Sequence, residues 1–169
     1  MTFISPGVEG SLPALPLQLQ LNWSSDWGWG IPLIVFTVTI HVVGFALISR
    51  ETLNASSRTI RRHPVTVFVV VVGLTTLLAT TLHGIEAFIW AMAYRYLGAL
   101  PDNRSAMLYS LNAMTSFGHI DLHLADHWHL LGAIEALNGW LLFGLSTAFL
   151  FTVIERVSSD MRRLRHDVS

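Results

Sequence analysis

The sequence predicts an all-α membrane protein in which three transmembrane helices are accompanied by a short helix that re-enters the membrane between the second and the third. Of its 169 residues, 52% are hydrophobic and only 12% are charged, whereas about 25% of the residues of a soluble domain are charged. Cysteine is absent, which excludes a disulfide framework and thiol chemistry. The net charge of −1 offers no basic surface to a nucleic acid, so we expect no nucleic-acid partner.

Three apolar segments supply the predicted spans, namely Ile31–Ser49, Val65–Leu97 and Leu130–Val153. The first has 19 residues and contains no acid or arginine, and about 20 residues cross a ~30 Å hydrocarbon core. The second is longer than a crossing requires, so it must tilt or extend beyond the bilayer. The third carries Glu135 and Asn138 near its start and still has enough apolar residues to span.

A short amphipathic segment, Asn103–Met114, lies between the second and third spans. Pro101 and Asp102 favour a helix start, and apolar residues follow at roughly helical spacing. A helix of about a dozen residues is only ~18 Å long. It can therefore enter a bilayer without crossing it, as a re-entrant helix does.

The distribution of arginine predicts the orientation. All ten basic residues are arginine, and eight of them lie either between the first two spans or after the third. Because positive charge favours the cytoplasmic side, we expect residues 1–30 outside and the basic tail, 156–169, in the cytoplasm. Three tryptophans, Trp23, Trp27 and Trp29, would anchor the first span, residues 31–49, at the outer interface. We expect an integral protein of the bacterial inner membrane.

The chain from about Leu82 to Glu155 resembles the two-helix pore module of the potassium channel superfamily, especially its small bacterial members. The resemblance rests on "LYSLNAMTSFG", on "LLGAIEALNGWLLFG" and on the stretch after the short helix. The family's selectivity filter reads T-V-G-Y-G-D after a pore helix that ends in threonine. The corresponding residues here are Thr115 for that threonine and then Ser116, Phe117, Gly118, His119, Ile120 and Asp121. The resemblance implies a pore module over residues 64–155, with a pore helix at 103–114, a filter at 115–121 and an inner span at 130–153.

The same resemblance implies a homotetramer, since an axial filter needs four copies of the loop. Main-chain carbonyls of the filter would then replace the hydration shell of K⁺ or another monovalent cation, and no further cofactor is expected. Asp121 would be the acid at the outer mouth. Ile120 stands where the family has its second glycine, and a β-branched residue is poorly suited to a positive φ. Either the backbone differs there, or surrounding packing holds a strain on the order of 1–3 kcal/mol.

Three residues are candidates to support this filter from behind, namely Asn112, Glu86 and Glu135. The two glutamates lie inside spans, where ionisable side chains point to function. They could brace the pore helix through hydrogen bonds, remain partly hydrated near the outer interface, or bind a metal. His41, in the first span, is expected to be a core histidine with its hydrogen bonds satisfied or to face a neighbouring span.

Histidines gather after the filter and raise the possibility of a metal site. His123, His127 and His129 alternate with acids in a short stretch, and imidazole with carboxylate binds divalent transition metals. A solvated outer loop is the alternative. His83 and Glu86 lie three residues apart on one helical face, and Glu135 could approach them to form a second metal site.

These observations predict a passive cation channel. Ile120 motivates one alternative, a channel-derived subunit that does not conduct and modulates a partner. The histidines and glutamates motivate another, an intramembrane transporter or binding protein for a divalent metal. We expect no enzyme, because the sequence has no Walker loop, no Gly-x-Ser-x-Gly and no His-Glu-x-x-His.

Overall fold

A computed structural model describes residues 17–53, 64–118 and 122–166. The described residues form helices and loops without a strand, so the all-α prediction is confirmed. The helices are α1 (Leu17–Leu53), α3 (Pro64–Tyr96), α4 (Asn103–Met114), the short 3₁₀ turn η1 (Asp126–Trp128) and α5 (His129–His166). Three of them, α1, α3 and α5, are long and apolar enough to cross a membrane.

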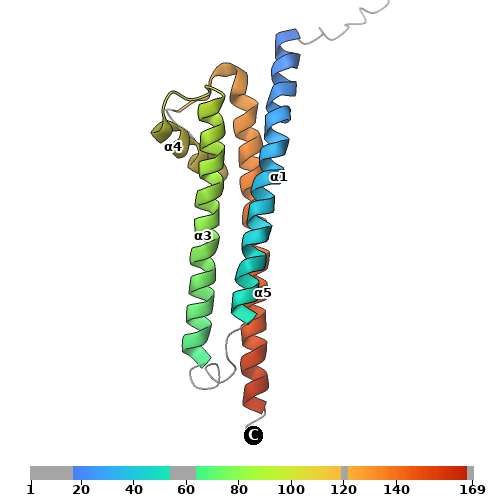
Figure 1. Ribbon diagram of the computed structural model, residues 1–169, viewed down its shortest axis with the longest axis vertical. Helices are drawn as coiled ribbons and strands as arrows, with labels where there is room; N and C mark the ends of the chain where they lie inside the picture. Colours follow the sequence, from blue (N-terminus) through green and yellow to red (C-terminus); the bar gives the residue numbers. More distant parts are fainter. Residues whose placement is uncertain (1–16, 54–63, 119–121, 167–169) are drawn as a thin grey trace, which may run out of the picture.

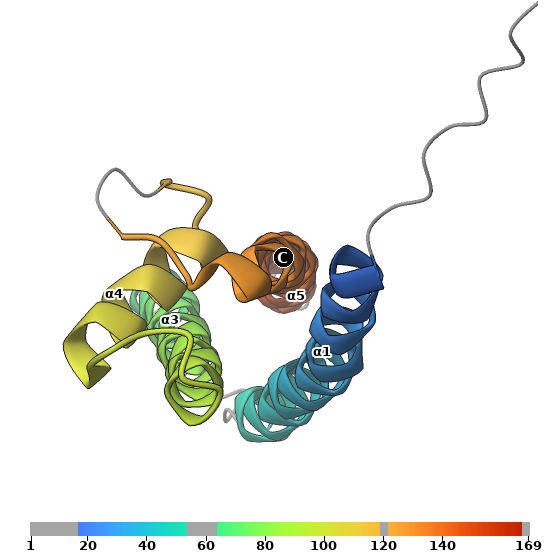
Figure 2. The same cartoon turned by 90° about the horizontal axis from the view of Figure 1, so that it is seen from above.

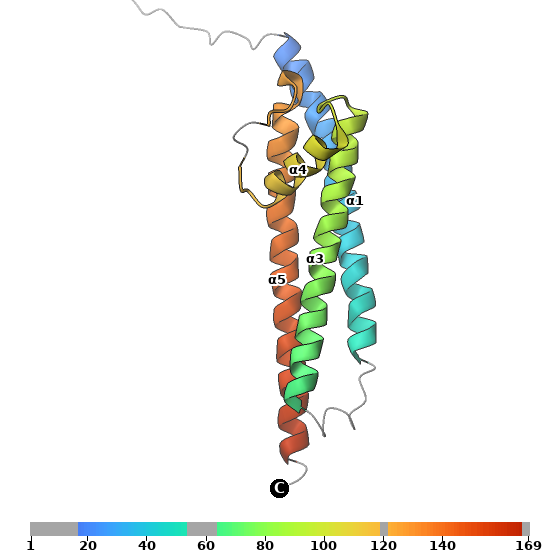
Figure 3. The same ribbon diagram turned by 90° about the vertical axis from the view of Figure 1, so that its left-hand side faces the viewer.

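The three long helices run side by side, and α4 lies across one end of the α3–α5 pair (Figure 1). Seen from above, α1 and α4 occupy opposite sides of that pair (Figure 2). The third view shows α4 between α3 and α5, with the chain leaving its C-terminal end toward the outside of the bundle (Figure 3). In this arrangement α1 and α4 each pack against α3 and α5, on opposite sides of the pair.

The first helix begins at Leu17, well before the expected span at Ile31. Tertiary contacts account for the extension. Gly30 approaches α5 so closely that a Cβ there would lie 2.7 Å from a methyl group of Ile134. Trp27 packs against the apolar core as well. Trp27 and Gly30 therefore lie in a packed part of the helix, where packing provides most helix stability, while Trp23 and Trp29 are exposed.

The core is concentrated at the end of the bundle that holds α4. It joins large buried side chains of three helices, including Trp90, Tyr94, Tyr109, Leu131 and Ile134. Farther along α3 and α5, large apolar side chains are mostly exposed in the single chain. Such a surface has to be covered by lipid or by other protein.

Candidate functional site

The N-terminal end of α4 is fixed by a capping aspartate. Asp102 accepts hydrogen bonds from the backbone N–H of Ser105 at 2.9 Å and from its hydroxyl at 2.7 Å. These bonds favour the ionised form and lower the pKa of Asp102. The preceding loop is tied down by Arg95, which donates to the Leu100 carbonyl at 2.6 Å and to the Asn103 side chain at 2.9 Å. The start predicted from Pro101 and Asp102 is the observed one.

At its other end α4 gives way to a turn of unusual backbone geometry. Thr115 caps the helix, and its hydroxyl donates to the Leu111 carbonyl at 2.7 Å. The next residues alternate in conformation, because φ is +53° at Ser116 and +91° at Gly118. The Trp140 indole of α5 donates to the Ser116 hydroxyl at 2.8 Å. The Ser116 N–H donates to the Ala113 carbonyl and the Phe117 N–H to the Asn112 carbonyl, both at 3.0 Å, so Ser116 is the left-handed residue of a Schellman cap that ends α4.

The remaining filter positions are less fully defined. Phe117 is exposed, and its N–H donates to the main-chain carbonyl of Asn112 at 3.0 Å. The side chain of Asn112 is half-buried. His119, Ile120 and Asp121 lie outside the described residues. The geometry of the candidate filter is therefore that of Thr115–Gly118.

Two glycines let α4 approach α5 very closely. A Cβ on Gly132 would collide with the Tyr109 hydroxyl, and a Cβ on Gly139 would collide with the backbone of Met114. Seven residues separate the glycines, which places them on one face of α5, two turns apart. They form a groove for the second half of α4. Gly139 is therefore a packing residue in this structure.

Glu135 connects the three helices α3, α4 and α5. It is fully buried on α5 and accepts a hydrogen bond from the Tyr94 hydroxyl of α3 at 2.5 Å and another from the Ser110 hydroxyl of α4. The Ser110 hydroxyl also lies 2.7 Å from the Ala87 carbonyl of α3. A buried carboxylate costs free energy unless such donors surround it. Glu135 thus contacts the short helix directly, in the manner expected of a brace.

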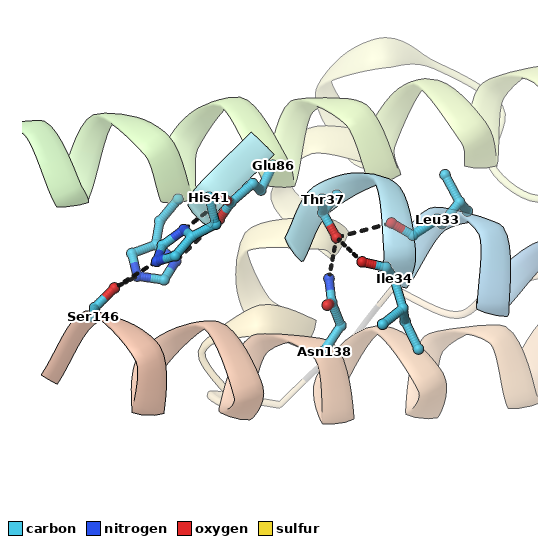
Figure 4. Close-up of polar contacts among 8 residues, drawn as sticks. Leu33, Ile34, Thr37, His41, Glu86, Asn138 and Ser146 are labelled. Carbon is cyan, nitrogen blue, oxygen red and sulfur yellow. Dashed lines mark hydrogen bonds and ion pairs between the residues drawn. The ribbon is translucent and has the colours of Figure 1, made fainter. Parts of the chain in front are cut away.

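Glu86 has different neighbours from those expected. Its carboxylate lies 2.6 Å from Nδ1 of His41 (Figure 4). Its other oxygen lies 3.4 Å from Nδ1 of His83. Nε2 of each of these histidines lies close to the Ser146 hydroxyl, at 3.0 and 2.9 Å. The partners of this side chain are His41 of α1 and His83 of α3, and it has no hydrogen bond or ion pair to α4 among the described residues, so its assignment as a support of the filter is corrected. The expected burial of His41 is confirmed.

A second polar contact joins α1 to α5 one turn away. The Asn138 amide donates to the Thr37 hydroxyl at 2.9 Å, and that hydroxyl donates back to carbonyls of its own helix (Figure 4). Each of these two polar contacts between α1 and α5 is made by polar residues within apolar segments. The four residues are Thr37, His41, Asn138 and Ser146. Their spacings of four and eight residues place each pair on one helical face, and this was the signal that sequence reasoning missed.

Among the residues that the structure describes, His123, His127 and His129 are not brought together as a group of metal ligands. His129 is turned toward the Leu124 carbonyl, 2.8 Å away, and His127 packs against the Trp128 ring. Within residues 17–53, 64–118 and 122–166, the cluster of three potential metal ligands consists of His41, His83 and Glu86. The expected grouping of His83, Glu86 and Glu135 is corrected. Glu135 instead accepts hydrogen bonds from the Tyr94 hydroxyl of α3 and the Ser110 hydroxyl of α4.

A cavity of about 580 Å³ lies beneath the C-terminal end of α4. Residues of α3, α4 and α5 line it, among them His83, Gly84, Met114, Thr115 and Trp140. It therefore connects the surroundings of the turn with the exposed edge of the His41–His83–Glu86 cluster.

Comparison with known proteins gives no independent assignment, since no family model, no curated protein and no solved structure matches the chain.

Proposed function

We propose that this protein is the pore-forming subunit of a homotetrameric, potassium-channel-like cation channel. One observation carries the proposal. A 12-residue helix, α4, packs against α3 and α5 at one end of the bundle and is followed at once by a turn in which alternate residues have positive φ. The helix is ~18 Å long and too short to cross a bilayer.

The alternation supports an ion-coordinating role for the turn. In an extended strand successive carbonyls point in opposite directions. Positive φ at Ser116 belongs to the cap of α4, whereas positive φ at Gly118, two residues on, lies beyond the cap and rotates a further peptide plane, so carbonyls of neighbouring residues can turn toward the same side. Four such turns around an axis would form rings of oxygens that replace the water around a monovalent cation.

The direction of α4 adds an electrostatic contribution. A helix carries about half a negative charge at its C-terminal end. The end of α4 leads into Thr115 and Ser116, so this partial charge lies beside the proposed filter. Four copies would favour a cation there, as would Asp121 at the outer mouth.

The bracing contacts support the same assignment, because coordination requires fixed oxygens. Glu135, Ser110 and Tyr94 tie α4 to both flanking helices in the buried interior. Gly139 admits the last turn of α4, and Trp140 holds Ser116. On this proposal the exposed apolar faces of α3 and α5 contact lipid and neighbouring subunits, with the N-terminus outside and the C-terminus in the cytoplasm of a bacterium.

Ion flux into liposomes tests the proposal. Purified protein would be reconstituted in vesicles loaded with K⁺, and flux would be compared with Na⁺ and with empty vesicles. The variant Ile120→Gly restores the residue that the resemblance implies, while Ile120→Val keeps the branched side chain as a matched control. We expect cation flux from the wild type that becomes faster or more K⁺-selective in Ile120→Gly alone.

Two results would count against conduction by this chain. Absence of flux from the wild type and from both variants would favour the rival function, a channel-derived subunit that modulates a partner. A particle that is not tetrameric, measured by mass photometry or native mass spectrometry, would remove the shared axis on which the filter depends.

A further inference from the structure

The cluster on the other side of α3 does not contribute to the proposed filter, yet it joins all three long helices. His41 comes from α1, His83 and Glu86 from α3, and Ser146 from α5. We propose that His41, His83 and Glu86 bind a divalent transition-metal ion of the Zn²⁺ type, with Ser146 orienting the two imidazoles.

The distances suit such an ion. One ligand atom from each of the three residues lies within 4.8 Å of the others. The Glu86 carboxylate stands beside both imidazoles, with one oxygen 2.6 Å from His41 Nδ1 and the other 3.4 Å from His83 Nδ1. Zn²⁺ binds nitrogen and carboxylate oxygen at about 2.0–2.2 Å, so tetrahedral ligand atoms are roughly 3.3 Å apart. Small side-chain rotations bring the present atoms to that spacing.

Hydrogen bonding at Ser146 explains why the Nδ1 atoms are the available ligands. A serine hydroxyl has two acceptor lone pairs and one proton. When both imidazoles donate their Nε2–H groups to the Ser146 oxygen, both Nδ1 lone pairs face Glu86. Metal-binding histidines commonly donate their second ring N–H to such an outer partner. The arrangement therefore has the hydrogen-bond pattern of a ligand pair.

With both histidines neutral and no cation bound, the same arrangement is poorly satisfied. Glu86 is fully buried, and its second carboxylate oxygen has no hydrogen-bond partner among the described residues. If neutral His41 donates its Nδ1–H to that carboxylate, its Nε2 accepts the single proton of the Ser146 hydroxyl. Neutral His83 then has a lone pair facing an oxygen, either that of Ser146 or that of Glu86. A buried, incompletely paired carboxylate within an apolar bundle is costly. A divalent ion removes the conflict by accepting all three lone pairs.

The ligand types select the class of ion. Two imidazoles and one carboxylate match three-ligand zinc sites that leave a fourth position for water. Ca²⁺ and Mg²⁺ prefer sites made of oxygen alone. The open position has a route outward, because the His83 side chain is 31% exposed and lines the cavity beneath α4.

Metal binding to purified protein tests the proposal and requires no conduction, so its outcome is independent of the channel function. Chelator-treated protein would be titrated with Zn²⁺ by calorimetry, and bound metal would be counted by mass spectrometry. We expect one Zn²⁺ per chain, and a Co²⁺-loaded sample with the visible absorption of a four-coordinate site. His41→Gln, His83→Gln and Glu86→Gln should each abolish this stoichiometric binding.

Two further variants distinguish metal binding at the His41–His83–Glu86 cluster from binding to surface histidines and from loss of binding through misfolding. Replacing His123, His127 and His129 together by glutamine removes the exposed imidazoles and should leave the stoichiometry unchanged. Ser146→Ala keeps all three ligands and should weaken binding by roughly 10–100-fold. The proposal is overturned if the wild type takes up no Zn²⁺, if the outer triple variant loses the bound ion, or if folded Glu86→Gln and Ser146→Ala bind as tightly as the wild type.

Discussion

Replacing Gly139 by alanine is the sharpest test of how α4 is held. The added Cβ would lie 2.2 Å from the Met114 carbonyl oxygen and 2.7 Å from its Cα. Ordinary contact begins at 3.4 Å, so the backbone at the end of α4 would have to retreat by 3.4 − 2.2 Å, or 1.2 Å. Backbone cannot rotate away as a side chain does, and overpacking of this kind costs about 1–3 kcal/mol.

Gly144→Ala is the matched control because a Cβ there meets nothing within 4 Å. Both variants gain about 1 kcal/mol in helix propensity, since alanine favours a helix over glycine. The difference between them therefore isolates the contact with α4. We expect Gly139→Ala to be less stable than Gly144→Ala by about 1–3 kcal/mol.

Unfolding of both variants in the same detergent measures this difference, and liposome flux measures its effect on the proposed filter. Thr115 directly follows Met114, so a shift of 1.2 Å at the carbonyl displaces the start of the filter. We expect Gly139→Ala to lose flux while Gly144→Ala retains it. Equal stability of the two variants would refute the close approach of α4 to α5.

Three other predictions follow from single contacts. Glu135→Leu leaves the buried Tyr94 hydroxyl without its acceptor, while Ser110 can still donate to the Ala87 carbonyl, and it should destabilise the protein by about 1–3 kcal/mol, measured by unfolding in detergent against Glu135→Gln, which can still accept a hydrogen bond. Hydrogen bonds from Ser105 lower the pKa of Asp102, so the ionised cap stabilises the protein at pH values above the ordinary pKa of 3.8. This stabilisation is lost as the pH falls through the lower pKa of the folded state. Melting curves should show the loss in the wild type and not in Asp102→Asn, and identical pH profiles of the two proteins would contradict the prediction. Trp140→Phe removes the exposed bond to Ser116 and should alter flux or selectivity while changing stability by less than about 0.5 kcal/mol, whereas an unchanged flux would show that the bond does not position the turn.

Local signals predicted the helices well. An uninterrupted apolar run determines a long helix almost alone, because every backbone group must be satisfied within it when the surroundings are hydrocarbon. The start of α4 was equally local, since Asp102 caps it with its own side chain. The first helix was expected to be shorter, because the contact of Gly30 with Ile134 depends on residues far apart in the chain.

The site could be predicted only in part. Glu135 was a candidate to brace the short helix, but so was Glu86, and sequence alone does not show which direction each side chain faces. Rotation about the helix decides it, and that rotation is set by the neighbours. His41 was expected to be buried, yet its pairing with Glu86 joins positions 45 residues apart. The outer histidines were the more conspicuous cluster in the sequence, although proximity along a loop does not bring ring nitrogens together.

The two buried glutamates lie in the two proposed sites, and both sites include a residue of α5. Glu135 fastens α4 to α5, and the Glu86 cluster fastens α1 to α5 through Ser146. Seven residues separate Ser146 from Gly139, which corresponds to about 10 Å along the helix. A metal ion bound by His41, His83 and Glu86 would therefore not touch the proposed filter. Any effect on conduction would have to pass along α5 as a change in its position relative to α4, and it would require different metal affinities in the two positions.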